Sequence, residues 1–229
     1  MDTDQILTVL RLSVVVALSA VALLAVPGVA LGWLLARVRF PGRALVDALV
    51  HAPLVLPPVA LGWLLLELCK PKGLLGVWLH PLGLDLVYTW KGAAVAAAVM
   101  AAPLLIRAVR LAVELVDPKL EDAARTCGAS PWRVLATVTL PLAAPGILAG
   151  LMLAFARALG EYGATITLCG DLPGETRTLP VAIHALLDLP GDHGETTAAV
   201  LAVISLAVAL AALIGADVVA RWLTRRLRA

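Results

Sequence analysis

Five long apolar stretches follow one another along the 229-residue chain, and short polar segments separate them. A helix needs roughly 20 mostly apolar residues to cross a bilayer, because each residue adds about 1.5 Å and the hydrocarbon core is about 30 Å thick. The stretches therefore predict five membrane-spanning helices. Their ranges are 12–36, 44–68, 90–106, 142–159 and 197–220.

The composition supports this interpretation. Hydrophobic residues make up 61% of the chain and charged residues 15%, whereas a soluble domain is about half apolar and about a quarter charged. The first stretch is too long for an ordinary signal peptide and follows the acidic leader "MDTDQ", so we interpret it as a retained anchor. We expect an all-α polytopic membrane protein with one transmembrane domain over residues 1–229.

Basic residues indicate how the spans are oriented. Lysine and arginine concentrate in three segments, 37–43, 107–133 and 221–228. These segments follow the first, third and fifth spans, so all three lie on the same side of the membrane. By the positive-inside rule that side is the cytoplasm. We therefore expect the N-terminus outside, the C-terminus inside, and external loops near 70–88 and 160–195.

The second span contains three prolines that an uninterrupted helix would not tolerate. Pro53, Pro57 and Pro58 must bend or break it, because proline lacks the N–H that continues the hydrogen-bond ladder. Broken helices at membrane depth tend to line cavities. Pro57 and Pro58 are therefore candidates for the wall of a translocation path.

Residues 117–141, "DPKLEDAARTCGASPWRVLATVTLP", form a polar segment between two spans. Asp117 is a good N-cap and Pro118 suits the first helical position. Gly128 can end this helix in a left-handed turn, Pro131 can start another, and Pro141 marks the junction with the next span. The pattern predicts a helix of about ten residues, about 15 Å long and too short to cross a membrane.

Two interpretations of this segment fit its pattern. It could be a polar connector that lies in the headgroup region, since amphipathic interfacial helices are common. It could instead be a docking helix for a cytoplasmic partner, because Ala123 and Ala124 keep one side of it flat. Glu121 and Arg125 are spaced to pair across one helical turn.

The segment resembles the EAA loop of ABC importer permeases, a Glu-Ala-Ala triplet followed at fixed spacing by glycine, a branched apolar residue and Leu-Pro. Asp122 replaces the glutamate, with Glu121 beside it, and Val138 replaces the usual isoleucine. In the family this loop forms coupling helices that seat in a groove of the ATP-hydrolysing subunit. The resemblance implies that role for Glu121, Asp122, Ala123, Ala124, Gly128, Val138, Leu140 and Pro141.

Longer segments, including "RFPGRALVDALVHAPLVLPPVALGWLLL", "LAFARALGEYGATIT" and "PGETRTLP", look like the molybdate branch of these permeases. The resemblance implies a bacterial inner-membrane subunit of an importer for a tetrahedral oxyanion, most readily molybdate. It also implies two paired copies, two cytoplasmic ATPase subunits and an external binding protein. Permeases for sulfate or tungstate are the alternative, and the sulfate permeases share much of "RALGEYGA".

Enzyme classes find little support in the sequence. A phosphate-binding loop requires a Gly-Lys dipeptide, and the chain has none, so ATP hydrolysis is expected on a separate subunit. The four histidines form no His-Glu-x-x-His pattern, and no Gly-x-Ser-x-Gly elbow is present. The pattern indicates no cofactor and no metal. An ion-coupled secondary carrier also needs a polar path, but it would not need a docking loop.

Two opposite charges lie late in the fourth span. Arg157 falls roughly 22 Å along the helix from Leu142, where an arginine is costly unless it is paired or faces water. Glu161 lies one turn later and can supply the pair. Two interpretations stay open: the pair staples the helix near the interface, or Arg157 lines the outer path and Glu161 keeps it from trapping the anion.

Overall fold

The computed structural model describes residues 1–189 and 192–228, and every regular element in that part of the chain is helical. The side chains of His193 and of the tail beyond Arg221 lie outside the described part of the chain. The tail includes Arg225, Arg226 and Arg228, which we expect to be cytoplasmic. The all-α class is confirmed. The elements are α1 (Thr3–Arg37), α2 (Arg43–Val55), α3 (Pro58–Cys69), α4 (Gly76–Leu79), η1 (His80–Leu82), α5 (Trp90–Glu114), α6 (Pro118–Thr126), α7 (Pro131–Val134), η2 (Leu135–Thr139), α8 (Leu140–Leu159), α9 (Gly163–Cys169), α10 (Leu179–Leu187) and α11 (Asp192–Arg228).

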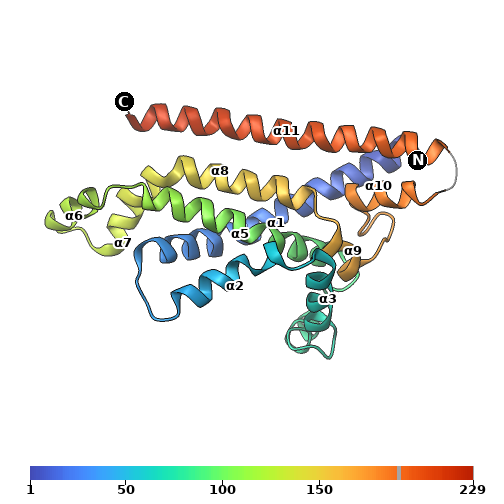
Figure 1. The fold of residues 1–229 in the computed structure, drawn as a ribbon, viewed down its shortest axis with the longest axis horizontal. Coiled ribbons are helices and arrows are strands. Elements are labelled where there is room, and N and C mark those ends of the chain that lie inside the picture. The colour runs from blue at the N-terminus through green and yellow to red at the C-terminus, as the bar shows by residue number, and fades with distance from the viewer. Residues whose placement is uncertain (190–191, 229) are drawn as a thin grey trace.

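Among the described residues, four helices are long and apolar enough to cross a membrane, and the bent pair α2 and α3 makes a possible fifth span. Helices α1, α5, α8 and α11 run along the longest axis of the molecule, and the two chain ends lie at opposite ends of it (Figure 1). Five spans are consistent with this arrangement. Helix α1 begins earlier than predicted, at Thr3, and α5 continues to Glu114, because polar residues at span ends extend the helix beyond the apolar core.

Helix α5 lies at the centre of the bundle, and glycines let its neighbours approach it closely. Two glycines of α1 lie so near α5 that an added Cβ would come within 2.7 Å of one of its side chains, and two glycines of α8 do the same at 2.5 and 2.8 Å. Spans in lipid associate through close van der Waals packing of small residues. The four glycines are Gly28, Gly32, Gly146 and Gly150.

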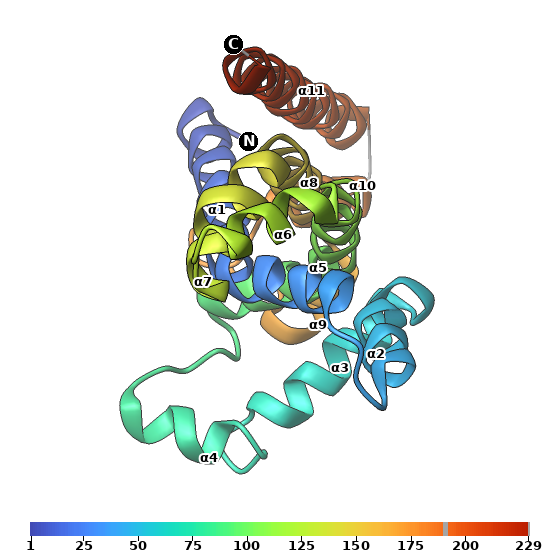
Figure 2. The same ribbon diagram turned by 90° about the vertical axis from the view of Figure 1, so that its left-hand side faces the viewer.

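The second predicted span is broken, as its prolines indicated. Helix α2 ends at Val55, α3 begins at Pro58, and the two axes differ by 115°. Leu56 takes the extended backbone that a residue before proline prefers, and Pro57 and Pro58 have no N–H to continue the ladder of α2. Helix α3 consequently leaves the bundle sideways and carries α4 with it (Figures 1 and 2).

Both halves of the broken span are held to the bundle. Asp47 of α2 pairs with Arg110 of α5 at 3.0 Å. Gly62 of α3 lies so close to α9 that an added Cβ would come within 2.8 Å of the Cα of Ala164. The bend is therefore fastened on each side, to α5 by charge and to α9 by close backbone packing.

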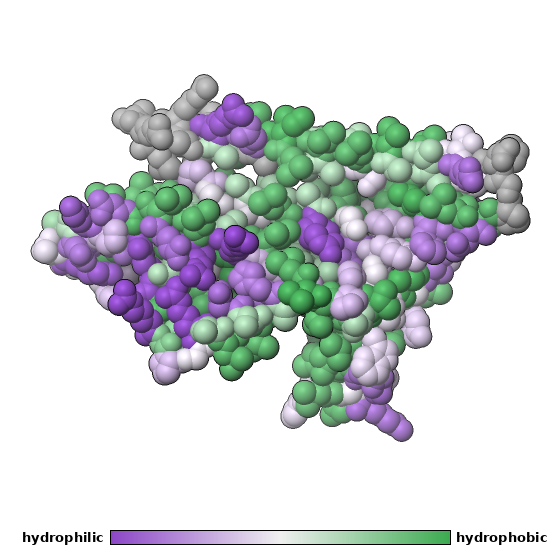
Figure 3. Space-filling model, viewed as in Figure 1, coloured by the Kyte–Doolittle hydropathy of each residue, from purple (hydrophilic) through white to green (hydrophobic). Residues whose placement is uncertain are grey.

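Apolar side chains dominate the outer surface along the bundle, and polar ones gather at the end that carries α6 and α7 (Figure 3). Helix α11 exposes Val203, Leu206 and Ile214, and α3 exposes Val59 and Trp63. Apolar surface this extensive is unfavourable in water but matches the hydrocarbon core of a bilayer or a neighbouring helix.

Candidate functional site

The polar segment between α5 and α8 folds as two short helices joined by a sharp turn. Asp117 accepts a hydrogen bond from the Lys119 N–H at 2.9 Å, and α6 begins at Pro118. Gly128 has φ +85°, the left-handed region, and its N–H donates back to a carbonyl of α6 at 2.9 Å. Helix α7 then begins at Pro131. The predicted cap, glycine turn and second helix start are all present.

The helix that follows does not stop at Pro141, where a junction was predicted. Residues 131–159 form one continuous helical span that contains a π-helical turn, η2. The Leu140 N–H donates to the Leu135 carbonyl, five residues back. A proline inside a helix removes a hydrogen bond and crowds the preceding turn, and a widened π turn relieves that crowding. Pro141 therefore marks a change in helix pitch rather than an end.

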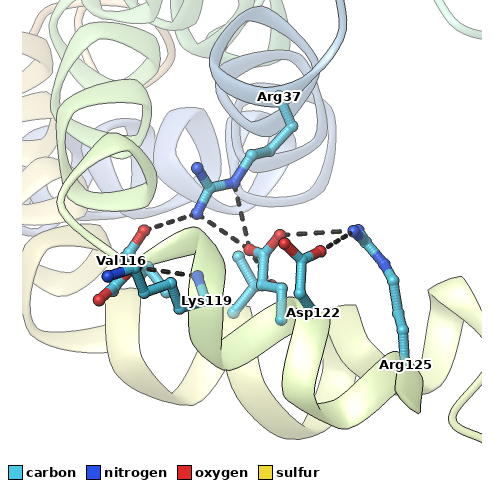
Figure 4. Close-up of polar contacts among 8 residues, drawn as sticks. Arg37, Val116, Lys119, Asp122 and Arg125 are labelled. Atoms are coloured by element: carbon cyan, nitrogen blue, oxygen red, sulfur yellow. Dashed lines mark hydrogen bonds and ion pairs between the residues drawn. The ribbon is translucent and has the colours of Figure 1, made fainter.

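Glu121 of α6 is a buried acid held by side chains from other elements. Its Oε1 lies 2.9 Å from Arg37 Nη2, at the end of α1, and accepts a hydrogen bond from the Thr139 hydroxyl at 2.8 Å. Arg37 Nη2 also donates to the Val116 carbonyl at 2.9 Å. Figure 4 shows Arg37 reaching from α1 toward Val116 and α6, with Arg125 on the far side of the cluster. The predicted pair of Glu121 with Arg125 is present but longer, at 3.7 Å.

Helix α6 buries an acid and exposes both polar and apolar side chains. Its only buried residue is Glu121, whereas Leu120 is half exposed and Ala123 is exposed. Asp122, at the position of the EAA glutamate, is exposed and pairs with Arg125 at 2.9 Å. The outward face of α6 therefore combines charged and apolar side chains, and its inward face is the acid Glu121.

The residues of the EAA-like pattern separate into two groups in space. Asp122, Ala123 and Gly128 lie on the exposed face of the loop, and Ala124 is half-buried. Val138, Leu140 and Pro141 lie instead at the base of α8, also half-buried. Leu140 borders an apolar groove of about 710 Å³ between α1 and the α7–α8 segment, which Trp33 and Trp132 also line. The first group is exposed to the surroundings, and the second lies where the loop joins the next span.

The other candidate residues lie near α9, at the far end of α8 from α6. Arg157 Nη1 lies 2.7 Å from Glu161 Oε2, and the Glu161 side chain is 2% exposed. The other oxygen of Glu161 accepts the Ala164 N–H at 2.9 Å and so caps the start of α9. Arg157 keeps 27% of its side chain exposed. Pro57 and Pro58 are exposed at the bend, and the start of α9 packs against Pro58.

The described residues hold no evident metal or redox centre. No group of three or more His, Cys, Asp or Glu side chains in this part of the chain could hold a metal ion. All three cysteines are free: Cys69 and Cys169 are buried, and Cys127 is exposed at the end of α6. Burial raises the pKa of the Cys169 thiol to about 12, so it stays protonated at neutral pH.

Two residues of the cluster around Glu121 were not predicted. Arg37 entered the sequence argument only as one of the basic residues that indicate orientation, and it lies 84 positions before Glu121. Thr139 lies between Val138 and Leu140, at a position that the EAA-like pattern leaves unspecified. The one available signal was a basic residue at the end of a span, which cannot identify a partner so distant in sequence.

Comparisons with known proteins agree with this arrangement. Residues 28–229 match the family described as "Binding-protein-dependent transport system inner membrane component". The chain is 49% identical to the molybdenum transport system permease protein ModB of Escherichia coli (strain K12), over 86% of this chain and 84% of that protein. It is 43% identical to ModB of Haemophilus influenzae (strain Rd), over 97% of this chain and 95% of that protein. The sulfate transport system permease protein CysT of Escherichia coli (strain K12) is 36% identical, over 70% of this chain and 58% of that protein.

Solved structures share the fold at lower identity. A bacterial ABC transporter involved in the import of the polysaccharide alginate has a TM-score of 0.74 at 20% identity, covering 96% of this chain and 80% of that one. The MetNI methionine ABC transporter, in an inward-facing conformation, has a TM-score of 0.67 at 18% identity, covering 97% of this chain and 99% of that one. The arrangement of spans and loop described above is thus the fold of these transporter chains.

Proposed function

The chain belongs to the family of binding-protein-dependent transport system inner membrane components, and we propose that it forms the membrane path of an ATP-driven importer for molybdate. The observation that carries this proposal is α6, a capped helix that buries Glu121 and exposes Leu120 and Ala123 at the polar end of the spans. A short helix with capped ends and an exposed face suits a docking partner better than it suits a simple connector.

The docking partner in this proposal is an ATPase subunit, one for each of two permease copies. ATP binding closes the ATPase pair, α6 moves with the subunit on which it sits, and the spans reorient between outward-open and inward-open states. The N-terminus lies outside and the C-terminus in the cytoplasm, since α6 and the end of α1 lie among the basic segments. An external binding protein delivers the anion; one of the similar alginate transporters was solved in complex with its periplasmic protein.

Pairing of two copies accounts for the surface around the broken span. Helices α2 and α3 expose Leu45, Leu49, Val59 and Trp63, and α3 extends away from the bundle (Figure 2). A second copy that packed on this side would cover apolar area and enclose the bend at Pro57 and Pro58. The translocation path would then lie between the two copies, with the bends in its wall.

Arg157 is the proposed contact for the anion in the outer part of this path. Its guanidinium is partly exposed, while Glu161 is fully buried beside it. A guanidinium can meet an oxyanion through charge-assisted hydrogen bonds. Because Glu161 neutralises part of the charge, the site can bind the anion and still release it.

Molybdate is proposed over sulfate because the molybdenum permeases match more closely and over more of the chain than the sulfate permease does. The test is uptake of radiolabelled molybdate by proteoliposomes that contain the permease, its ATPase and its binding protein. We expect ATP-dependent uptake that tungstate competes with and sulfate affects weakly. Preferential competition by sulfate would assign the chain to the alternative substrate. Uptake driven by an ion gradient without ATP would support a secondary carrier.

A further inference from the structure

One buried carboxylate links α6 to the membrane spans. Of the nine residues of α6, only Glu121 is buried. Its Oε1 contacts both Arg37, through Nε at 3.1 Å and Nη2 at 2.9 Å, and the hydroxyl of Thr139 at 2.8 Å. Arg37 ends α1, and Thr139 ends the π turn at the base of α8. The carboxylate therefore joins three elements that are distant in sequence.

Burying this charged cluster costs free energy, so its presence suggests a role beyond filling space. A buried carboxylate is unfavourable unless it is paired and hydrogen-bonded, and losing one partner leaves an uncompensated charge. An apolar residue at position 121 would fill the same space without that requirement. The charged arrangement adds directionality, since Arg37 is held at once by Glu121 and by the Val116 carbonyl between α5 and α6.

The π turn supplies the second half of the attachment. In η2 the Leu140 N–H reaches back five residues, so this turn is wider than an α-helical turn. Thr139 lies at the end of this turn and is 1% exposed, with its hydroxyl on Glu121. Such π turns occur frequently at functional sites.

We propose that Arg37 and Thr139 are positioning residues, which lock α6 through Glu121 to α1 and to the base of α8. When the docked ATPase moves α6, α1 and the base of α8 then move with it. This inference rests on the proposed function. Covalent linkage alone does not provide the connection, because α6 follows α5 directly but reaches α1 only through side chains.

The first test measures transport per ATP in proteoliposomes of the complete complex. Glu121→Gln removes the charge but leaves the exposed face of α6 intact. We expect the ATPase subunit to copurify and hydrolyse ATP, while anions transported per ATP fall by about fivefold or more. Thr139→Val, a milder change, should lower the ratio less. The matched control is Glu114→Gln, which removes an acid paired only within α5, to Arg110 at 2.9 Å, and should leave the ratio unchanged.

A purely structural role would lower the yield or thermal stability of both variants and leave transport per ATP unchanged. That result would overturn the proposal. If Glu121→Gln does not insert, Thr139→Val decides, because it removes a single hydroxyl. A normal ratio in that variant would then also contradict the lock.

The second test does not depend on the substrate. Spin labels are attached to Cys127, exposed at the end of α6, and to Arg39→Cys, just after α1, with the two buried cysteines replaced. In the wild-type complex, we expect the same distribution of distances between the two labels without nucleotide and with ATP trapped. In the Glu121→Gln complex, we expect this distribution to be broader or shifted. Equal distributions in wild type and variant would refute the lock. Absence of uptake in the wild type would refute only the proposed substrate, since the label distances would still report on α6 and α1.

Discussion

Gly163 lies directly against Pro58: a Cβ added to Gly163 would come within 2.7 Å of the Cβ of Pro58 and 3.3 Å of the Val59 nitrogen. The contact joins the start of α9 to the bend between α2 and α3. Because Gly163 is two residues from Glu161, the bend and the Arg157–Glu161 pair belong to one region of the molecule. A shift of the broken span should therefore displace the ion pair.

Gly163→Val tests this contact. The added side chain must push α9 away from the proline ring, and overpacking of this kind costs about 1–3 kcal/mol. We expect uptake to fall, while copurification of the ATPase stays normal because α6 is remote from α9. The control is Gly160→Ala, where the nearest atom to an added Cβ is a carbonyl oxygen at 3.8 Å. Uptake equal to wild type in Gly163→Val would show that the close contact has no functional role.

The double variant Arg157→Gln with Glu161→Gln separates the two interpretations of the ion pair. A glutamine at 161 can still accept the Ala164 N–H, so the start of α9 stays capped. Removing both charges leaves neither one unpaired, so folding should be nearly unaffected. If Arg157 meets the anion, the variant will assemble with its ATPase yet transport poorly.

Full uptake by that double variant would assign the pair to stapling alone. A suitable control is the same double replacement of Glu67 and Lys70, an ion pair whose side chains are 42% and 45% exposed. Exposed pairs contribute little to stability. The control should therefore transport normally.

Gly128→Val tests the turn that ends α6. An added Cβ at Gly128 meets nothing within 4 Å, but φ is +85°, so the effect is backbone strain of about 1–2 kcal/mol without steric clash. We expect the permease to insert and the ATPase to be lost on copurification, with Gly128→Asn less affected. The matched control is Gly83→Val, where φ is +67° and the surroundings are equally open. Normal uptake and copurification in Gly128→Val would favour the polar connector.

Labelling with a membrane-impermeant maleimide tests the orientation. Cys127 is exposed in the native protein, whereas Cys69 and Cys169 are buried, and the raised pKa of Cys169 keeps its thiol unreactive. We expect Cys127 to react only after the cells are permeabilised. A Glu175→Cys variant that also carries Cys127→Ser should react in intact cells, because Glu175 is exposed in the loop that we propose to be external. Reaction of both from the same side would refute the five-span topology.

The sequence by itself determined the features that depend on neighbouring residues. Apolar length set the spans, Pro57 and Pro58 set the bend, and Asp117 and Gly128 set the ends of α6. The spans follow from apolar length measured against the thickness of a bilayer. The bend and the helix ends follow from the hydrogen bonds and backbone angles that single residues allow. The EAA-like pattern likewise identified the loop and the family, because its residues are consecutive or closely spaced.

Only the tertiary structure decided which acid of α6 is buried. Resemblance to the EAA loop gave Glu121 and Asp122 the same expected role in coupling, yet Glu121 lies inside and Asp122 outside. Adjacent residues on a helix point about 100° apart, so the inward direction depends on where α1 and the base of α8 lie. Arg37 defines that direction from 84 residues away, and Thr139 does so from a π turn. Pairing across such distances follows from the packing of the spans, which no local pattern encodes.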